Sequence, residues 1–109
     1  MKTLKFSWPL VKMILSGEKT VTWRINDDKA LHTGDIVSCL TPSSSEFAEI
    51  KITEIKETEF AKLTLRDKEG HEHFASEAEM YETYSRSYKV AVTPETKLKV
   101  ARFVVLKNL

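Results

Sequence analysis

Apolar and polar residues alternate along several short stretches of the chain, and this period of two predicts β-strands. The clearest alternation covers residues 20–25, where one face carries Val21, Trp23 and Ile25 and the other carries Thr20, Thr22 and Arg24. Further strands are predicted by apolar stretches at residues 4–6, 36–40, 47–55 and 98–106. Ile55 has the opposite parity to Ile50 and Ile52, which predicts a β-bulge or a strong twist near that residue.

Two segments have the 3.6-residue period of an amphipathic helix. The first begins near Pro9, whose missing N–H is tolerated in an opening turn, and ends at Gly17, which suits a left-handed cap. The second follows Ser76, which forms a capping-box pattern with Glu79, and its stripe consists of Met80, Tyr84 and Tyr88. Residues 60–75 hold one short apolar turn and are otherwise the least core-like part of the chain. Strands therefore dominate, and their order favours an α+β closed sheet or small barrel over a doubly wound parallel sheet.

Composition predicts one ordinary globular domain covering residues 1–109. The chain has 41% hydrophobic and 30% charged residues, which supports a single packed core at this length. One cysteine, Cys39, excludes an internal disulfide and a cysteine-based metal cage, and no apolar run reaches the roughly 18 residues of a membrane span. Lys5, Pro9 and Lys12 interrupt the apolar N-terminal stretch. We therefore expect a cytoplasmic protein with no signal peptide, no membrane or lipid partner and no cofactor.

The formal net charge of +1 is too low for a protein that tracks duplex nucleic acid through its bulk charge. The charge is unevenly distributed, because residues 83–109 hold six Lys or Arg against one Glu, a balance of +5. Such a bias is common on the solvated faces of strands and helix ends. The alternative is a phosphate-contacting patch made of Arg86, Lys89, Lys97, Lys99 and Arg102.

The first candidate for chemistry is the run from Gly17 to Arg24, since the sequence lacks a glycine-rich phosphate loop, a nucleophile elbow and a His-x-x-x-His pair. A strand places Thr20, Thr22 and Arg24 in a row. Lys19 has the wrong parity for this row and reaches Thr22 only from the turn after Gly17. The run is either an exposed ladder with a solvated lysine, or a partly desolvated amine that acts as a base for a hydroxyl.

Two further groups of residues are candidates. Residues 67–73 form a polar cluster with His71 and His73, which is either a solvated acidic loop or a carboxylate such as Glu69 that handles a proton over a pocket. Its fixed ligands are too few to predict a metal site. The aromatic group serves either a packed core or a pocket mouth that holds a base, and it consists of Trp8, Trp23, Tyr81, Tyr84 and Tyr88. Cys39 is expected to be a buried packing residue.

The order of these motifs is specific. A glycine-ended helix leads into the pattern G-x-K-T-x-T-x-R at residues 17–24, and Thr33-Gly34-Asp35 precedes the next strand. Glu69-Gly70, a tyrosine-rich helix and a final strand at residues 103–106 follow. This order, over nearly the whole chain, resembles an ASCH domain, a branch of the PUA-like superfamily. The resemblance implies a small, mostly antiparallel β-barrel of about five to six strands with two or three flanking helices. It also implies a ligand cleft formed by the first helix, the following strand and the 66–75 segment.

The resemblance divides the expected function. Many ASCH domains are taken to bind RNA or nucleotides, and one branch resembles the N4-acetylcytidine amidohydrolases, which use a Lys, a Thr and a Glu. By motif these roles fall on Lys19, Thr22 and Glu69, with Glu72 and Glu77 as competing choices for the acid. The residues expected to contact a ligand are Thr20, Trp23, Arg24, His71, Tyr84 and Tyr88.

Four functions therefore stand as hypotheses. The first is an RNA- or nucleoside-binding module, in which Lys19, Arg24 and the basic C-terminal residues contact phosphates while an aromatic residue stacks on an unpaired base. The second is a metal-independent amidohydrolase that removes an acyl group from a modified nucleoside and needs no basic surface. The third is a ribonuclease with His71 or His73 as acid or base. The fourth is a pure interaction module, and the oligomeric state stays open.

Overall fold

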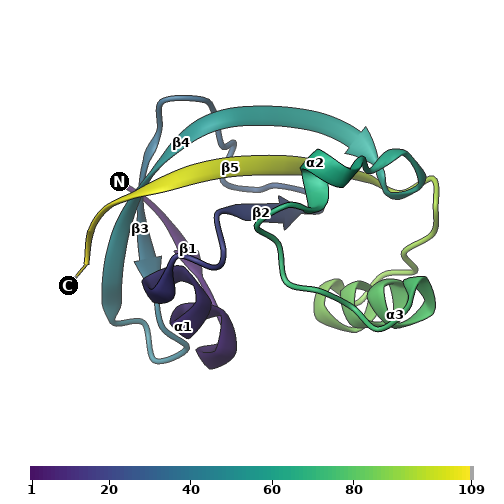
Figure 1. Ribbon diagram of the computed structural model, residues 1–109, viewed down its shortest axis with the longest axis horizontal. Coiled ribbons are helices and arrows are strands. Elements are labelled where there is room, and N and C mark those ends of the chain that lie inside the picture. The colour runs from purple at the N-terminus through teal and green to yellow at the C-terminus, as the bar shows by residue number, and fades with distance from the viewer. Residues whose placement is uncertain (109) are drawn as a thin grey trace.

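The computed structural model describes residues 1–108 and shows five strands in one strongly curled sheet with three helices (Figure 1). The strands are β1 (Lys2–Lys5), β2 (Val21–Arg24), β3 (Ile36–Leu40), β4 (Glu46–Glu59) and β5 (Lys97–Asn108). The helices are α1 (Trp8–Ser16), α2 (Leu65–Lys68) and α3 (Glu77–Tyr88), and a 3-10 turn, η1 (Phe60–Lys62), precedes α2. The sheet order is β1-β3-β4-β5-β2, with β1 and β3 parallel and the other pairs antiparallel. The predicted α+β, barrel-like fold class is confirmed.

The curl of the sheet comes from its two long strands, β4 and β5, which pair along nearly their whole lengths. Their register shifts between Glu49 and Ile50 and again between Ile52 and Glu54. An extra residue on one strand bends and twists a pair of strands, so the sheet turns over on itself as a half-barrel. The second shift lies next to Ile55, where the break in parity predicts a bulge.

The end of α1 sets the direction of the chain into the candidate site. Pro9 occupies the first turn, and Gly17 is left-handed (φ 85°), a conformation that suits glycine because it has no Cβ. The N–H of Gly17 donates to the carbonyl of Ile14 (3.2 Å), and the N–H of Lys19 donates to the carbonyl of Met13 (3.0 Å). Lys19 is therefore held against the helix end rather than within the strand.

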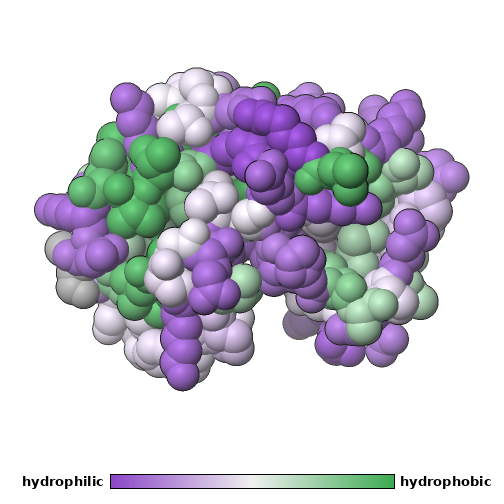
Figure 2. All heavy atoms as spheres, in the orientation of Figure 1, coloured by the Kyte–Doolittle hydropathy of each residue, from purple (hydrophilic) through white to green (hydrophobic). Residues whose placement is uncertain are grey.

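Two apolar clusters cover different parts of the sheet. The first packs α1 against the sheet and includes Leu4, Ile14, Val37, Ile50 and Phe103. The second packs α3 against β2 and β5 and includes Trp23, Met80, Tyr84, Leu98 and Val100. Successive residues of a strand point to opposite faces, and for this reason neighbours on β5 belong to different clusters. In Figure 2 the surface is hollowed at its lower edge, between the part of the molecule that carries α1 and the part that carries α3.

The segment between β4 and α3 is better anchored than its polar sequence predicts. The hydroxyl of Thr64 caps α2, and the carboxylate of Asp67 accepts from Thr64 N–H (2.9 Å) and from Lys56 Nζ (2.8 Å). The carbonyl of Gly70 accepts from Thr20 N–H (2.9 Å), and a Cβ at Gly70 would overlap the Thr20 hydroxyl. This close approach joins the segment to the start of β2. The segment, predicted to be the least core-like part of the chain, has buried side chains at Asp67 and His71.

The start of α3 agrees with the predicted cap in part. The hydroxyl of Ser76 accepts from Glu79 N–H (3.1 Å), as a capping box requires. The carboxylate of Glu79 accepts from Ala75 N–H (3.2 Å) instead of the N–H of Ser76.

Within residues 1–108, no helix has the length and apolarity needed to cross a membrane.

Candidate functional site

Lys19 is an unusual lysine because its side chain is only 1% exposed. Its Nζ donates to the backbone carbonyl of Val21 (2.8 Å) and to Glu72 Oε1 (2.6 Å). Burial lowers the pKa of Lys19, the Glu72 carboxylate opposes that shift, and the charge of Arg24 adds to it. Buried ionisable groups with one specific charged partner are concentrated at functional sites.

The Lys19 ammonium lies on the free edge of the sheet. β2 is an edge strand whose neighbour is β5. The carbonyl of Thr20 accepts from the N–H of Phe103 on β5 (3.0 Å). Carbonyls alternate in direction along an extended chain, so the next one, on Val21, points away from β5. Lys19 therefore supplies a partner for a backbone carbonyl that β5 does not reach, beside the segment whose Gly70 carbonyl accepts from Thr20 N–H.

Thr22 lies next to this edge with a buried side chain. It pairs with Ala101 of β5 and shares a strand face with Arg24. The carbonyl that Lys19 contacts belongs to the peptide bond between Val21 and Thr22, so the ammonium lies one peptide group away from Thr22. The structure describes both side chains and shows no hydrogen bond between them. Lys19 and Thr22 are thus neighbours without direct bonding.

Glu72 is the carboxylate that forms the ion pair with Lys19, and its side chain is 23% exposed. Burial is the largest single influence and opposes the ionisation of Glu72, but the charge and hydrogen bond of Lys19, together with His71 and a backbone hydrogen bond, outweigh it and lower the pKa of Glu72. Glu69, to which the motif assigns the acid, has an exposed side chain, and its backbone carbonyl accepts from Arg102 Nη1 (3.2 Å). Glu77 is exposed at the start of α3. Of the three carboxylates considered from the sequence, the structure brings Glu72 to the lysine.

His71 contacts Glu72 from the other side. Its Nε2 is 3.2 Å from Glu72 Oε1 and 3.1 Å from the Tyr84 hydroxyl, and its Nδ1 is 2.9 Å from the backbone carbonyl of Glu72. Burial, with help from the Lys19 charge, lowers the pKa of His71 to about 4, so the ring is neutral at pH 7. A neutral ring has one N–H, and the Glu72 carbonyl is closer to Nδ1 (2.9 Å) than the Glu72 carboxylate is to Nε2 (3.2 Å), which favours the proton on Nδ1 and makes Nε2 the acceptor of the Tyr84 hydroxyl. Burial raises the pKa of Tyr84, which keeps that hydroxyl a donor.

The aromatic residues predicted to contact a ligand form the wall behind this network. The ring of Trp23 stacks on His71 (centroids 3.7 Å apart, planes at 15°), and its Nε1 donates to the carbonyl of Asp67 (3.1 Å). Tyr84 stacks on Trp23 (6.1 Å) and on Tyr88 (6.2 Å). Trp23 and Tyr84 are buried, whereas Tyr88 is half-buried. Core packing therefore occupies both Trp23 and Tyr84.

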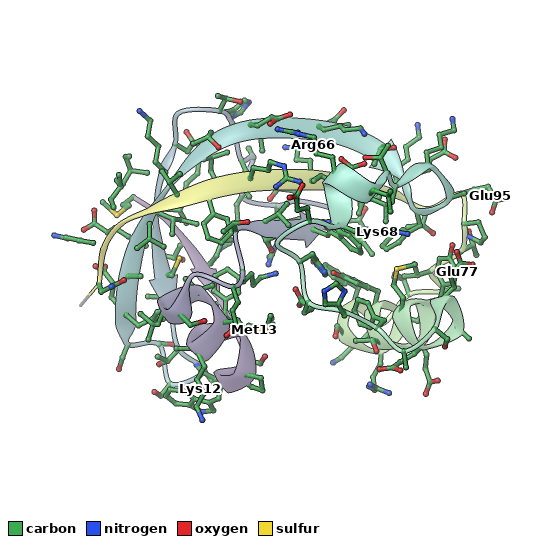
Figure 3. The ribbon with its side chains drawn as sticks, in the orientation of Figure 1. Lys12, Met13, Arg66, Lys68, Glu77 and Glu95 are labelled. Atoms are coloured by element: carbon green, nitrogen blue, oxygen red, sulfur yellow. The ribbon has the colours of Figure 1, made fainter. Side chains whose placement is uncertain are left out.

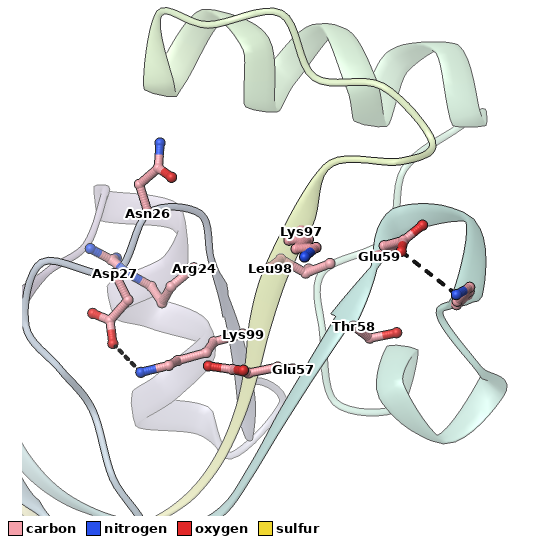
Figure 4. Close-up of a pocket in the computed structure, with 10 residues that line it drawn as sticks. Arg24, Asn26, Asp27, Glu57, Thr58, Glu59, Lys97, Leu98 and Lys99 are labelled. Carbon is pink, nitrogen blue, oxygen red and sulfur yellow. Dashed lines mark hydrogen bonds and ion pairs between the residues drawn. The ribbon is translucent and has the colours of Figure 1, made fainter.

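Two cavities flank the network. The smaller, of about 140 Å³, is lined by Glu72, and Lys68 at the end of α2 and Glu77 at the start of α3 also line it (Figure 3). The larger, of about 590 Å³, has Arg24 in its wall and lies beside β4 and β5 (Figure 4). Neither cavity has a lining residue from α1, and the exposed Thr20 lines neither. Across residues 1–108 there is no group of three His, Cys, Asp or Glu side chains that could hold a metal ion.

Gly70, two residues before Glu72, indicates in the sequence that Glu72 contacts Lys19. Gly70 has a positive φ (80°), and its carbonyl bonds to Thr20, the residue after Lys19. The two residues that follow Gly70 therefore enter the site. A glycine two positions before a carboxylate was the available signal, because only glycine allows so close an approach of the two backbones.

Comparisons with known proteins agree with this architecture. An ASCH domain from Lactobacillus crispatus is similar with a TM-score of 0.71 and 13% identity, covering 95% of this chain and 79% of that one. Protein EF3133 from Enterococcus faecalis has a TM-score of 0.73 and 18% identity, covering 93% and 72%. A ZmASCH mutant protein from Zymomonas mobilis has a TM-score of 0.67 and 18% identity, covering 98% and 71%. No curated protein has a significant match to this chain.

At such low identities these structures support the fold alone. The sequence model of the ASCH domain, in contrast, matches residues 5–107. That match includes the helix end, the run from Gly17 to Arg24 and the segment that carries Glu72. The chain therefore belongs to the ASCH domain family, within the PUA-like superfamily.

Proposed function

We propose that this ASCH domain binds a nucleoside, free or as an unpaired residue of RNA, at the free edge of β2 beside Lys19 and Glu72. The observation that carries the proposal is their ion pair, in which the ammonium is sealed and the carboxylate reaches the surface. A carboxylate accepts from the exocyclic amine of cytosine in nucleic-acid recognition. The ammonium is 1% exposed, so the carboxylate is the member of the pair that a ligand can reach. The pair thus supplies a charged acceptor, held in place by Lys19, for the exocyclic amine of cytosine.

Charge and aromatic packing support a small ligand. The net charge of +1 favours a single nucleoside or a short unpaired segment over a long duplex, whose binding depends on many phosphate contacts. Trp23 already has His71 against its ring. The half-buried Tyr88, stacked on Tyr84, is more accessible to an unpaired base.

The same ion pair supports a second candidate function, the metal-independent removal of the acetyl group from N4-acetylcytidine. The Thr22 hydroxyl, or a water molecule, adds to the acyl carbon, the C–N bond breaks and the amine of cytidine leaves with a proton. One water is consumed in total, and the products are cytidine and acetate. When the proton of the pair resides on Glu72, Lys19 can take the hydroxyl proton and Glu72 can give its proton to the leaving amine. We propose Glu72 for the acid in place of Glu69 because Glu72 contacts Lys19.

The ribonuclease alternative has less support. An acid–base pair of histidines needs both rings at the substrate. The ring of His71 is 1% exposed and both of its nitrogens face protein groups, whereas His73 is exposed. The two histidines therefore do not offer two rings to one phosphate.

Equilibrium titration with cytidine tests the binding function. Glu72→Gln is expected to weaken binding by about tenfold or more, because a hydrogen bond to a charged group contributes about 1.5–3 kcal/mol. Glu69→Gln is the matched control, since it makes the same chemical change on the same segment at an exposed side chain. Equal affinities for both variants and the wild type would contradict the proposed site, as would a wild type that does not bind cytidine.

Chromatography of N4-acetylcytidine incubated with the protein tests the second candidate. Release of cytidine is expected from the wild type and from Glu69→Gln, and not from Lys19→Ala, Thr22→Ala or Glu72→Gln. Turnover that persists in Lys19→Ala would exclude the mechanism. A wild type that binds cytidine and releases none from the acetylated nucleoside would leave the binding function in place and remove the hydrolytic one.

A further inference from the structure

The larger cavity lies over a row of charged side chains that crosses three strands (Figure 4). The register places Arg24 of β2 opposite Lys99 of β5, and Lys99 opposite Glu57 of β4. Residues directly opposite one another point to the same face of a sheet, so the three side chains stand in line. The volume of about 590 Å³ lies within the roughly 300–1,000 Å³ that holds small organic ligands.

The charges in the cavity wall do not cancel. Four cations and three acids line it, namely Arg24, Lys62, Lys97 and Lys99 against Asp27, Glu57 and Glu59. Two ion pairs use part of this set: Lys99 Nζ lies 3.0 Å from Asp27 Oδ2, and Lys62 Nζ lies 3.6 Å from Glu59 Oε2 (Figure 4). Within residues 1–108, no ion pair joins Arg24 or Lys97 to an acid. The two ion pairs leave Arg24 and Lys97 against Glu57, so the cavity has an excess of one positive charge.

Arg24 also has an unpaired hydrogen-bond donor. Its buried Nε has no hydrogen-bond partner among residues 1–108. The nearest acid in the charged row, Glu57, stands two strand spacings away, about 10 Å between backbones, with Lys99 between them. The Lys19 ammonium is close enough for the Arg24 charge to lower its pKa, so two cations repel each other here. Buried donors are nearly always paired, and the planar guanidinium matches the oxygens of a phosphate.

We propose that Arg24 binds the phosphate group of a nucleoside monophosphate in this cavity, with Lys97 adding positive charge. The inference rests on the proposed function, because the nucleoside part occupies the edge beside Lys19 and Glu72. Glu72 lines the smaller cavity and Arg24 the larger, and along β2 the backbones of Val21 and Arg24 are three residues apart, which is about 10 Å in an extended strand. A nucleoside monophosphate spans that separation from its base to its phosphate. The preferred ligand is therefore the phosphorylated nucleoside rather than the free one.

The Nε–H of arginine gives its own signal in ¹H–¹⁵N NMR spectra, and this signal reports on Arg24 directly. The wild type is titrated with inorganic phosphate, cytidine, cytidine 5′-monophosphate and cytidine 3′-monophosphate. The Arg24 signal is expected to move with inorganic phosphate and with at least one monophosphate, and that monophosphate is expected to bind about tenfold more tightly than cytidine. The two isomers show at which end of the ribose the phosphate is held.

Two variants connect the preference to the cavity. Arg24→Gln is expected to bind the monophosphate and cytidine with equal affinity. Arg86→Gln is the matched control, because it removes the same charge from an exposed arginine on α3 that does not line the cavity, and it is expected to keep the preference. If circular dichroism shows that Arg24→Gln does not fold, Lys97→Gln replaces it and is expected to weaken monophosphate binding about threefold with cytidine binding unchanged.

The outcomes separate this subsite from the proposed function. Equal affinities of the wild type for cytidine and both monophosphates, or an Arg24 signal that phosphate does not move, would overturn the subsite, and cytidine binding alone would still support the proposed function. An Arg24 signal that moves with phosphate in a protein that does not bind cytidine would support the subsite and contradict the nucleoside site.

Discussion

Glu72→Gln removes the carboxylate from the ion pair and leaves the Lys19 ammonium buried. Removal of one partner from a buried pair costs about 3–5 kcal/mol, because the remaining charge has lost its compensation. Glu72 is 23% exposed and glutamine keeps an oxygen that accepts from Nζ, so we expect a loss of about 2–3 kcal/mol in the free energy of unfolding. With an unfolding entropy of about 2.1 cal/mol/K for each of 109 residues, Tm falls by about 9–13 °C.

Urea unfolding followed by circular dichroism measures this loss. The control Glu69→Gln is expected to stay within about 0.5 kcal/mol of the wild type, because its side chain is exposed. The double variant Lys19→Met, Glu72→Gln buries no charge and is expected to be less destabilised than the sum of the two single variants, by about 1.5 kcal/mol or more. A Glu72→Gln protein as stable as the control, or losses of the single variants that add up in the double variant, would mean that the pair does not stabilise the fold.

The pH dependence of the same variant gives an independent check. Without the carboxylate, the pKa of Lys19 in the folded protein falls further below its usual value of 10.5. Between that lowered pKa and 10.5 the unfolded chain binds more protons than the folded protein, so the variant gains stability as the pH rises through this range. The lowered pKa of Glu72 acts at the acid end of the wild type, where it contributes stability above about pH 4.5 that is lost as the pH falls further. A flat profile for the variant between pH 7 and 10 would contradict the buried ammonium.

Three further measurements address the parts around the pair. In urea unfolding, Gly70→Ala is expected to lower the free energy of unfolding by at least about 2 kcal/mol, because φ is 80° and the new Cβ would overlap the Thr20 hydroxyl. Gly34→Ala, at φ 95° in open space, is expected to lower it by only about 1 kcal/mol. Equal losses would argue against the close approach of Gly70 to Thr20. Cys39 is 0% exposed, and burial, with Glu46 nearby, raises its pKa to about 12. A thiol reagent is therefore expected to modify Cys39 only as fast as the protein unfolds. Rapid modification of the native protein would count against this packing. In ¹H–¹⁵N NMR spectra His71 should show the Nδ1–H tautomer at pH 7 and titrate near pH 4, and a titration near pH 6.5 would mean that the ring is not buried in the network.

Much of the fold could be predicted because the strands alternate and the helices have clear ends. Residues 20–25 and 36–40 correspond to β2 and β3, and Gly17 ends α1 where its left-handed cap requires. The parallel pairing of β1 with β3 could not be predicted, since strand order depends on tertiary packing and not on local pattern. The short helix α2 was also missed, although Thr64 and Asp67 form a capping pair around it that the sequence contains.

The candidate site could be predicted only in part. The motif from Gly17 to Arg24 singles out Lys19, but the contacts of its buried ammonium with Glu72 and the Val21 carbonyl depend on tertiary packing, which no local pattern encodes. Motif transfer favours Glu69 for the acid because it precedes Gly70, whereas the turn at Gly70 sends the side chain two residues later to the lysine. Local sequence thus identified the cation, and only the three-dimensional fold identified the carboxylate beside it.

A crystal structure of the protein with cytidine shows directly where the base binds. We expect the base to lie beside β2, with its exocyclic amine within hydrogen-bond distance of the Glu72 carboxylate. A complex in which cytidine binds elsewhere, with Glu72 contacting only Lys19 and His71 as it does in the free protein, would contradict the account.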